Sequence, residues 1–582
     1  MLAGRHHSVP RARRILFCGL LVLPLVSFAD SLKLEITGAE GALLENLRQG
    51  VSLAAESCEA PAWRVRSLLK RADRELQRAA RALGHYRLQV AEKSLQREGD
   101  CWQARIQVQP GEVVRIGRME LQISGDAERD PVFSRIVQRP SLQPGRPLNH
   151  GEYERLKQDL ERLALERGYL EARFKTRELR VDPAAGTADI RLHFESGPRY
   201  RVSRLNLQQE TYDPELLERY LTLREGDPYD SGKLNAMQKA LSDSGYFERV
   251  SVRPDLAGAT DGEIRVDVEL EPRKATAYRF GIGVATDTGP RLSAAYERRR
   301  INRYGHRLSL STQLSPADSS LKAEYLIPYN TPHTQQIGIE AAYRHQDTAA
   351  ALSDSYILGL RELGTRGGWN EVRALEWISE ESDIDGQVVD ATLLVPSITW
   401  SRTRADDRMR PQKGHRLNLN LRGAVSALLS DTSFFQASAG FKWINRLGSG
   451  RLLLRGEAGL TEVQAFEKLP ASYRFFAGGD QSVRGYEYRS LAPRDSNGRV
   501  EGGRYLLSGS IEYEHPVTRD WSVAAFVDAG DAFDSLNTDL RHSLGFGVRW
   551  QSPVGPVRLD LAFPSDTRED DFRIHFSMGP DL

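Results

Sequence analysis

The second half of the sequence alternates apolar residues with small or charged ones, in stretch after stretch from about residue 275 onward. In Tyr278–Val284 the apolar side chains alternate with Arg and Gly, and in Val557–Leu561 they alternate with Arg and Asp. Because a β-strand points successive side chains to opposite faces, each stretch predicts a strand with one apolar and one polar face. Such strands fit a membrane barrel with a wet interior or a large soluble β-sandwich.

The N-terminal segment favours the barrel. Arg11, Arg13 and Arg14 precede the apolar run Ile15–Phe28, and the small residue Ala29 follows it. This order is typical of a secretory signal peptide, and the run is shorter than the about 20 residues that a membrane helix needs. We expect a signal peptide over residues 1–29. Residues 275–582 then have the length for an all-β transmembrane barrel of about 16 antiparallel strands.

Composition excludes several functions. Lys and Arg number 80 and Asp and Glu 79, so a net charge of +1 provides no field that attracts nucleic acid. The sequence contains none of the hydrolase, metalloprotease or P-loop motifs, so we expect no enzyme activity, no cofactor and no metal. Cys58 and Cys101 form an even pair in an exported chain, which predicts a disulfide.

The N-terminal half has a different, repeating pattern. Three segments with apolar residues at helical spacing each end at a glycine followed closely by an aromatic residue: 65–83 before Gly84, 153–165 before Gly168, and 234–241 before Gly245. Glycine just past a helix suits a left-handed C-cap. Each unit then runs through strands to a proline, so the pattern predicts three tandem βααββ domains of α+β class.

These units resemble the POTRA (polypeptide-transport-associated) domain. Gly145-Arg146-Pro147 and Gly226-Asp227-Pro228 open the helices of the second and third units, as in that family, whereas the first unit lacks this entry. The resemblance divides the chain into a first POTRA domain over 30–111, a second over 112–198 and a third over 199–274. The barrel follows from residue 275 to 582.

A POTRA array before a barrel resembles the superfamily of outer-membrane assembly and secretion proteins that includes BamA, TamA and the two-partner secretion transporters. The most specific motif is Val483-Arg484-Gly485-Tyr486, which follows Gly478-Gly479. In this superfamily it lies on an extracellular loop that folds back into the lumen. The resemblance implies that Arg484 is held there by Glu512 and Asp528, with Gly485 and Tyr486 shaping and packing the loop tip.

The first and last barrel strands, about Tyr278–Val284 and Phe572–Met578, would meet at a seam. An unpaired strand edge is a template for another strand. The hypothesis is that this lateral seam opens and a client strand pairs there. Its predicted apolar residues are Tyr278, Phe280, Ile282, Phe572, Ile574 and Phe576.

Three POTRA domains and the terminal Gly579-Pro580-Asp581-Leu582 resemble the TamA branch more than BamA. That resemblance implies insertion or export of client outer-membrane proteins such as autotransporters. It also implies an inner-membrane-anchored TamB-like partner on the POTRA domains, contact with outer-membrane lipids and a part in phospholipid transport. The alternatives are a two-partner-secretion-type exoprotein pore, a general BamA-like insertase and, from another class, a passive porin.

Overall fold

The computed structural model describes residues 31–579 apart from 331–334, 408–409, 497, 536–538, 554 and 566–570. The predicted signal peptide and the residues 580–582 of the C-terminal motif lie outside the described residues. The chain forms two compact units, 1–200 and 201–582. Within the described ranges, no helix has the length and apolar character to cross a membrane.

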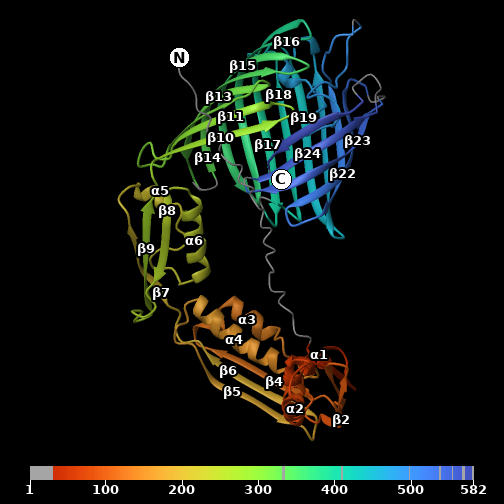
Figure 1. Ribbon diagram of the computed structural model, residues 1–582. Helices are drawn as coiled ribbons and strands as arrows, with labels where there is room; N and C mark the ends of the chain where they lie inside the picture. Colours follow the sequence, from red (N-terminus) through yellow and green to blue (C-terminus); the bar gives the residue numbers. More distant parts are fainter. Residues whose placement is uncertain are drawn as a thin grey trace, which may run out of the picture. The chain divides into compact units, whose positions relative to one another are not determined.

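Three α+β domains precede the barrel, and each has a three-stranded sheet in which the first strand pairs in parallel with the third. The second strand pairs with the third in antiparallel fashion, and the helices cover one face of each sheet (Figure 1). The predicted βααββ order is confirmed. The bounds in domain 1 are β1 Lys33–Thr37, α1 Gly41–Gly50, α2 Ala62–Ala82, β2 Gln89–Glu98 and β3 Cys101–Gln109; in domain 2, β4 Arg115–Ser124, α3 Pro131–Gln138, α4 His150–Glu166, β5 Arg173–Asp182 and β6 Thr187–Glu195; in domain 3, β7 Arg201–Gln208, α5 Pro214–Glu218, α6 Ser231–Asp243, β8 Phe247–Pro254 and β9 Glu263–Pro272.

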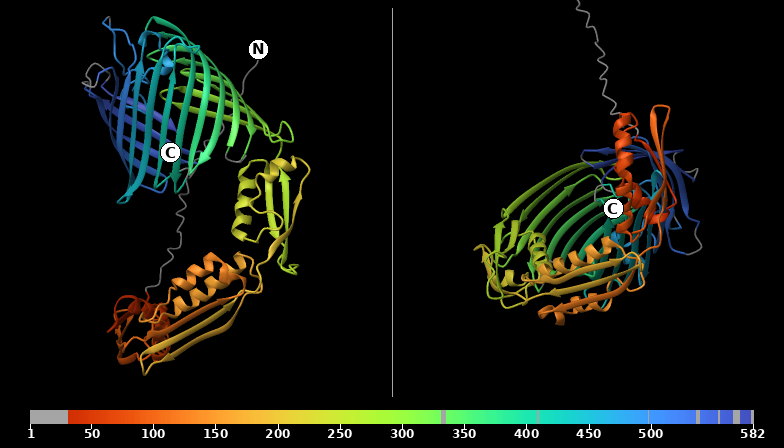
Figure 2. Two further views of the ribbon diagram at one scale, coloured as in Figure 1. Left: turned by 180° about the vertical axis from the view of Figure 1, so that it is seen from behind. Right: turned by 90° about the horizontal axis from the view of Figure 1, so that it is seen from below.

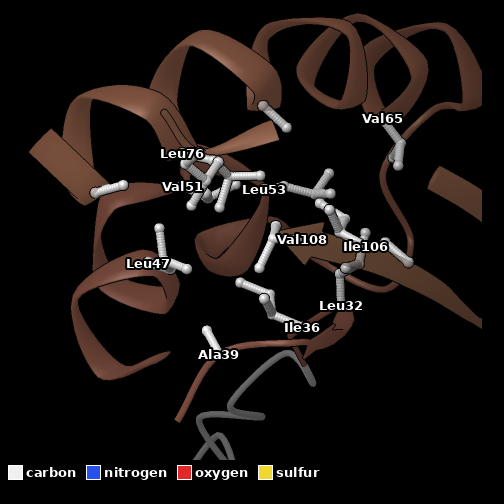
Figure 3. Close-up of a cluster of buried hydrophobic side chains, with 14 of the residues drawn as sticks. Leu32, Ile36, Ala39, Leu47, Val51, Leu53, Val65, Leu76, Ile106 and Val108 are labelled. Atoms are coloured by element: carbon white, nitrogen blue, oxygen red, sulfur yellow. The ribbon is translucent and has the colours of Figure 1, made fainter. Parts of the chain in front are cut away.

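The core of domain 1 shows how the sequence pattern becomes packing. Along β3 every second residue is buried, and Ile106 and Val108 point toward the helices, where Val65 and Leu76 of α2 are fully buried. Figure 3 shows these side chains converging between the helices and the strands. The alternating apolar residues of β3 and the helically spaced apolar residues of α2 therefore pack in one apolar core. This packing explains why the first unit folds although it lacks the Gly-x-Pro entry of the other two.

The three long helices begin about three residues earlier than the apolar spacing predicts. The side chain of Asn149 accepts hydrogen bonds from the first turn of α4, and the side chain of Asp230 does so for α6. These caps stabilise a first turn that carries no apolar signal. At the other end, Gly84, Gly168 and Gly245 all have positive φ, the backbone conformation predicted for the residue that follows each helix.

The C-terminal half is one 16-stranded antiparallel sheet whose strands run in chain order from β10 to β25 (Figures 1 and 2). This confirms the predicted barrel class and strand number. The bounds are β10 Thr276–Ala285, β11 Gly289–Arg298, β12 Arg307–Leu314, β13 Asp318–Pro328, β14 Gln335–Asp347, β15 Leu352–Arg366, β16 Trp369–Ile384, β17 Gln387–Ala405, β18 Gly414–Ala424, β19 Phe434–Leu447, β20 Gly450–Val463, β21 Tyr505–Pro516, β22 Trp521–Phe533, β23 Arg541–Ser552, β24 Gly555–Pro564 and β25 Arg573–Met578.

Side chains alternate between the outside and the lumen along these strands. On β22 the apolar Val523 and Val527 are exposed on the outer face, whereas Ser522, Phe526 and Asp528 are buried on the inner face. Exposed apolar residues on the outside of a closed wall are what a bilayer accommodates. The polar inner face provides the groups from which the site is built.

Domain 3 is joined to the barrel through the turn between β11 and β12. The Tyr246 hydroxyl donates a 2.9 Å hydrogen bond to the carbonyl of Gly305, and the Arg307 guanidinium lies 4.4 Å from the centre of the Tyr246 ring. Arg303 pairs with Asp213 at 2.9 Å. Because Tyr246 is 1% exposed, this contact fixes domain 3 to the barrel turn.

We expect Tyr246→Ala to loosen this joint, because truncating a buried aromatic side chain costs about 3–5 kcal/mol. Limited proteolysis of the full chain should then cut near residue 274, between domain 3 and the barrel, at least several times faster. Tyr304→Ala is the matched control, since Tyr304 is in the same turn and 54% exposed. Equal cleavage rates in the two variants would contradict the role of Tyr246.

Candidate functional site

The segment between β20 and β21, residues 464–504, folds against the inner face of the barrel. Its apolar residues Val483 and Tyr486 are buried together with Leu506 of β21 and Ala532 of β22. Nearer β16, Ser472 donates its backbone N–H to Glu380 at 3.0 Å. The loop, defined here as the lumen loop, is therefore held by both apolar packing and hydrogen bonds.

Arg484 lies at the centre of the lumen loop's polar contacts and is 4% exposed. Its Nε and Nη2 donate to the two carboxylate oxygens of Asp528 at 2.7 and 2.9 Å. Its Nη1 donates to Glu512 at 2.7 Å and to Asp560 at 3.2 Å. Arg484 stacks over Phe526 at 3.4 Å from the ring centre, so one guanidinium joins three wall strands to the loop.

A second arginine belongs to this network and extends it to Glu514, which lies 3.4 Å from Arg549. Arg549 on β23 donates to Glu512 at 2.6 Å and to Asp560 at 2.6 Å. Two guanidinium groups thus lie among the three carboxylates of Glu512, Asp528 and Asp560, and all five side chains are buried. Buried charges require such pairing, because an isolated ion in this environment is strongly unfavourable.

The local sequence explains how these groups reach one point. Glu512, Asp528 and Asp560 lie on the inward phase of β21, β22 and β24, where each alternates with outward apolar neighbours. Gly545 on β23 leaves room for Phe526, because a Cβ there would lie 2.3 Å from its ring. The wall is shaped by small residues so that the aromatic ring under Arg484 fits.

The structure places the remaining loop residues beside this network. Gly485 has a φ of +96° and donates its N–H to Nε2 of His575 at 2.8 Å. Tyr486 is buried, and its hydroxyl lies 3.4 Å from the carbonyl of His542. The five residues predicted for the loop lock, Arg484, Gly485, Tyr486, Glu512 and Asp528, therefore lie close to one another.

Sequence reasoning missed Arg549 and Asp560, although a signal was present. Both occupy polar positions in the alternating stretches 544–550 and 557–561, in the same phase as Glu512 and Asp528. His575 of β25 was not predicted to belong to the site either, although it contacts Asp480 of the lumen loop at 2.5 Å. Inward acids, arginines and histidines of neighbouring strands should be considered together.

The predicted seam residues lie on the two end strands of the sheet. Tyr278, Phe280 and Ile282 on β10 are exposed on the outer face, as is Ile574 on β25. Phe572 precedes β25, which begins at Arg573, one residue later than predicted. Phe576 is half-buried, and its carbonyl accepts the N–H of Thr286 at 3.0 Å.

β10 and β25 share no ladder among the described residues. Their described hydrogen bonds are instead made by Thr286, just beyond β10, whose N–H and hydroxyl contact the backbone of Phe576. The junction between β10 and β25 is thus weakly bonded in the described residues. By contrast, β10 pairs with β11 along ten residues, and β25 pairs with β24 along six.

The predicted disulfide is present. Cys58 follows the first helical segments of domain 1, and Cys101 is the first residue of β3; the bond closes a loop with a sequence separation of 43. It joins the turn that precedes α2 to the central strand of the sheet.

Comparisons with known proteins agree with this architecture. The family model described as "Omp85 superfamily domain" matches residues 272–581. Two further models, "POTRA domain TamA domain 1" and "Surface antigen variable number repeat", match residues 33–110 and 200–273.

Among similar proteins, the outer membrane protein assembly factor BamA of Neisseria meningitidis is 22% identical over 567 residues, which cover 85% of this chain and 70% of the relative. BamA of Nitratidesulfovibrio vulgaris is 25% identical over 399 residues, 64% of this chain and 50% of the relative. The crystal structure of Haemophilus ducreyi BamA lacking POTRA domains 1–3 shares the fold, with a TM-score of 0.64 at 17% identity, over 80% of this chain and 99% of that one.

The barrel, the POTRA domains and the family model over more than half of the sequence lead to one assignment. The chain belongs to the Omp85 superfamily, as an outer-membrane β-barrel with periplasmic POTRA domains that acts in protein assembly or secretion and not as an enzyme.

Proposed function

We propose that the protein inserts or exports client outer-membrane polypeptides by pairing a client strand with the edge of β10 or β25. The observation that carries this proposal is the junction of these two strands, which share no ladder within the described residues. A strand edge with free backbone groups is a template for strand addition. Its apolar flank faces the bilayer, where an emerging client strand needs its own apolar face.

The finer proposal is a TamA-type role. The match of domain 1 to the TamA domain 1 model and the three POTRA domains support it. A TamB-like, inner-membrane-anchored partner would dock on the POTRA domains, where the edges of the three-stranded sheets offer sites for strand addition. Autotransporters would be among the clients, and a contribution to phospholipid transport belongs to the same proposal.

The lock around Arg484 has a defined part in this function. It holds the lumen loop against β21, β22 and β24. While the loop is docked there, the wall strands beside the seam keep one arrangement, and the seam stays closed until the loop withdraws. A passive porin has no need of a weak junction or of POTRA domains.

A disulfide across the seam tests the proposal. Thr286 and Phe576 contact one another, so continuing the antiparallel register places Val284 beside Met578. With cysteines at both positions, oxidation should lower the rate of client assembly in reconstituted membranes by about tenfold or more. The covalent bond prevents the two strand edges from separating. Reduction should restore it, as followed by the folding of an autotransporter barrel.

The matched control places cysteines at Val523 and Val548, which already face each other in the β22–β23 ladder, away from the seam. Oxidation of that pair should leave assembly unchanged. If the locked seam assembles clients at the rate of the control, the seam proposal is wrong. A large, steady conductance in planar bilayers that persists with the locked seam would favour a secretion pore or a porin.

A further inference from the structure

Three ionisable side chains from separate segments meet at the end of the barrel that lies away from domain 3. Asp287 belongs to the turn between β10 and β11, Asp480 to the lumen loop and His575 to β25, and their polar atoms lie within 4.8 Å of one another. Asp480 donates its backbone N–H to Asp287 at 2.7 Å, and its carboxylate contacts Nδ1 of His575 at 2.5 Å. Asp480 therefore contacts both ends of the sheet.

The position of the proton on His575 follows from its partners. The N–H of Gly485 lies 2.8 Å from Nε2, and a backbone N–H can only donate. Nε2 is therefore the unprotonated nitrogen, and the proton on Nδ1 is donated to Asp480. The lumen loop thus holds His575 from both sides, through Gly485 and through Asp480.

This cluster lies beside the contact between the end strands. Asp287 is next to Thr286 in the sequence, and His575 is next to Phe576; the N–H of Phe576 donates to the hydroxyl of Thr286 at 2.6 Å. Asp480 is 8% exposed and His575 3%, so their hydrogen bonds are shielded from water. The closing contact of the seam is consequently supported by a buried group of the loop.

We propose that Asp287, Asp480 and His575 form a clasp, a set of positioning residues that holds β10 against β25 only while the lumen loop is seated. When the loop withdraws, Asp480 leaves both partners and the seam loses its support. The clasp is a property of the barrel by itself; only the use of the opened seam rests on the function proposed above. Loop position and seam opening are then one coupled transition.

Charge makes the clasp sensitive to pH. Two carboxylates meet in the clasp, and burial together with repulsion by Asp480 raises the pKa of Asp287 from 3.8 to about 7. The charged and titratable groups around the clasp are Asp480, His575 and Arg573 next to Asp287, Asp347, Glu487 and Tyr488 along the adjoining cavity, and Lys442, Arg455, Arg484, Glu512, Arg558 and Asp560 along the cavity beside His575.

The sign of the effect follows from the raised pKa. Ionised Asp287 is disfavoured in the closed clasp, so protonation stabilises the closed state, and that stabilisation is lost as the pH rises through about 7. If Asp287 has its ordinary pKa once the clasp opens, the closed-to-open ratio falls roughly tenfold between about pH 6 and about pH 8.

Hydrogen–deuterium exchange of the full chain in lipid nanodiscs measures the clasp directly, in peptides that cover Thr286 and Phe576. After correction for the intrinsic rate with an unstructured peptide, exchange should rise roughly tenfold from about pH 6 to about pH 8. Asp287→Asn should keep the low-pH protection at both values, because asparagine stays neutral. Asp480→Ala and His575→Ala should raise exchange at both values.

Glu487→Gln is the matched control, since Glu487 is on the same loop and lies 3.9 Å from Arg573 on β25, with 55% of its side chain exposed. It should leave exchange unchanged, because exposed pairs contribute little. An undiminished pH step in Asp287→Asn, or unchanged exchange in Asp480→Ala, would overturn the clasp.

A chelator separates the clasp from a metal site. A metal ion on Nδ1 would leave the proton on Nε2, facing the N–H of Gly485, so we expect no effect of EDTA; faster exchange after its addition would overturn the clasp. Because no client is present, the result is independent of the proposed function. If clasp variants show an open seam by their altered exchange but assemble clients as the parent chain does, only the proposal of seam-mediated insertion is contradicted.

Discussion

Arg484→Ala should produce the largest loss of both stability and client assembly among single substitutions in the barrel. Removing the guanidinium leaves Asp528 with Arg455 at 4.0 Å in place of its bidentate partner, and Glu512 and Asp560 then pair with Arg549 among the described residues. Breaking a buried ion pair from one side costs about 3–5 kcal/mol, because a charge remains buried without compensation. The urea midpoint of the barrel in detergent, read from heat-modifiable mobility on gels, should fall, and client assembly should be lost.

Two further variants separate charge from geometry. Arg484→Lys retains the charge but cannot reach three carboxylates with a planar fork, so we expect most of the loss to remain. Arg494→Ala removes an exposed arginine of the same loop, whose side chain donates to the carbonyl of Gly498, and should behave as the parent chain.

A charge-neutral background shows whether the lock acts only through stability. Arg484→Met combined with Asp528→Asn and Glu512→Gln removes most of the uncompensated charge and should restore much of the urea midpoint. Client assembly should remain impaired, because the loop is no longer held. Full recovery of assembly in this variant would show that the lock is structural only, and an unchanged midpoint in Arg484→Ala would contradict the energetic argument.

The second large effect is expected from the disulfide of domain 1. Replacing Cys58 and Cys101 together with serine frees a loop with a sequence separation of 43. By the chain-entropy relation this lowers the free energy of unfolding of domain 1 by about 4 kcal/mol. Pulse proteolysis in increasing urea should cut within residues 31–110 at a lower concentration than in the parent chain.

The barrel serves as the internal control for this variant, because domain 1 and the barrel belong to different compact units. The urea midpoint of the barrel should not change, and reductant should shift domain 1 in the parent chain but not in the serine variant. Identical proteolysis of the two proteins under oxidising conditions would refute the contribution of the disulfide.

Much of the fold could be predicted because the sequence repeats two simple periods. The apolar spacing of 65–83 predicts α2, and the period of two in 278–284 predicts β10, since each period reflects one local geometry. The predicted first residues of the helices were less accurate. Asn149 and Asp230 stabilise the first turn through hydrogen bonds, and the apolar spacing of the sequence does not reveal such bonds. The number of strands was predicted from the length of the C-terminal half divided by the number of residues that one strand and its connection need.

The site could be predicted only where a short motif is local. Val483–Tyr486 is contiguous, and the resemblance supplied Glu512 and Asp528. Asp560 lies 76 positions from Arg484, and His575 lies 95 from Asp480. Which inward residues meet depends on the register of every intervening strand and on the circumference of the closed sheet, and neither quantity is encoded locally.

The carboxylates that hold Arg484 lie on β21, β22 and β24, all of which follow the loop in the chain. During its own biogenesis the protein therefore cannot secure this loop until its final hairpins have paired. The complete set of partners of Arg484 is thus assembled late in maturation, and a chain truncated before β24 would hold the loop through Glu512 and Asp528 without Asp560. The barrel wall is therefore completed and the lumen loop fully docked in the same step of folding.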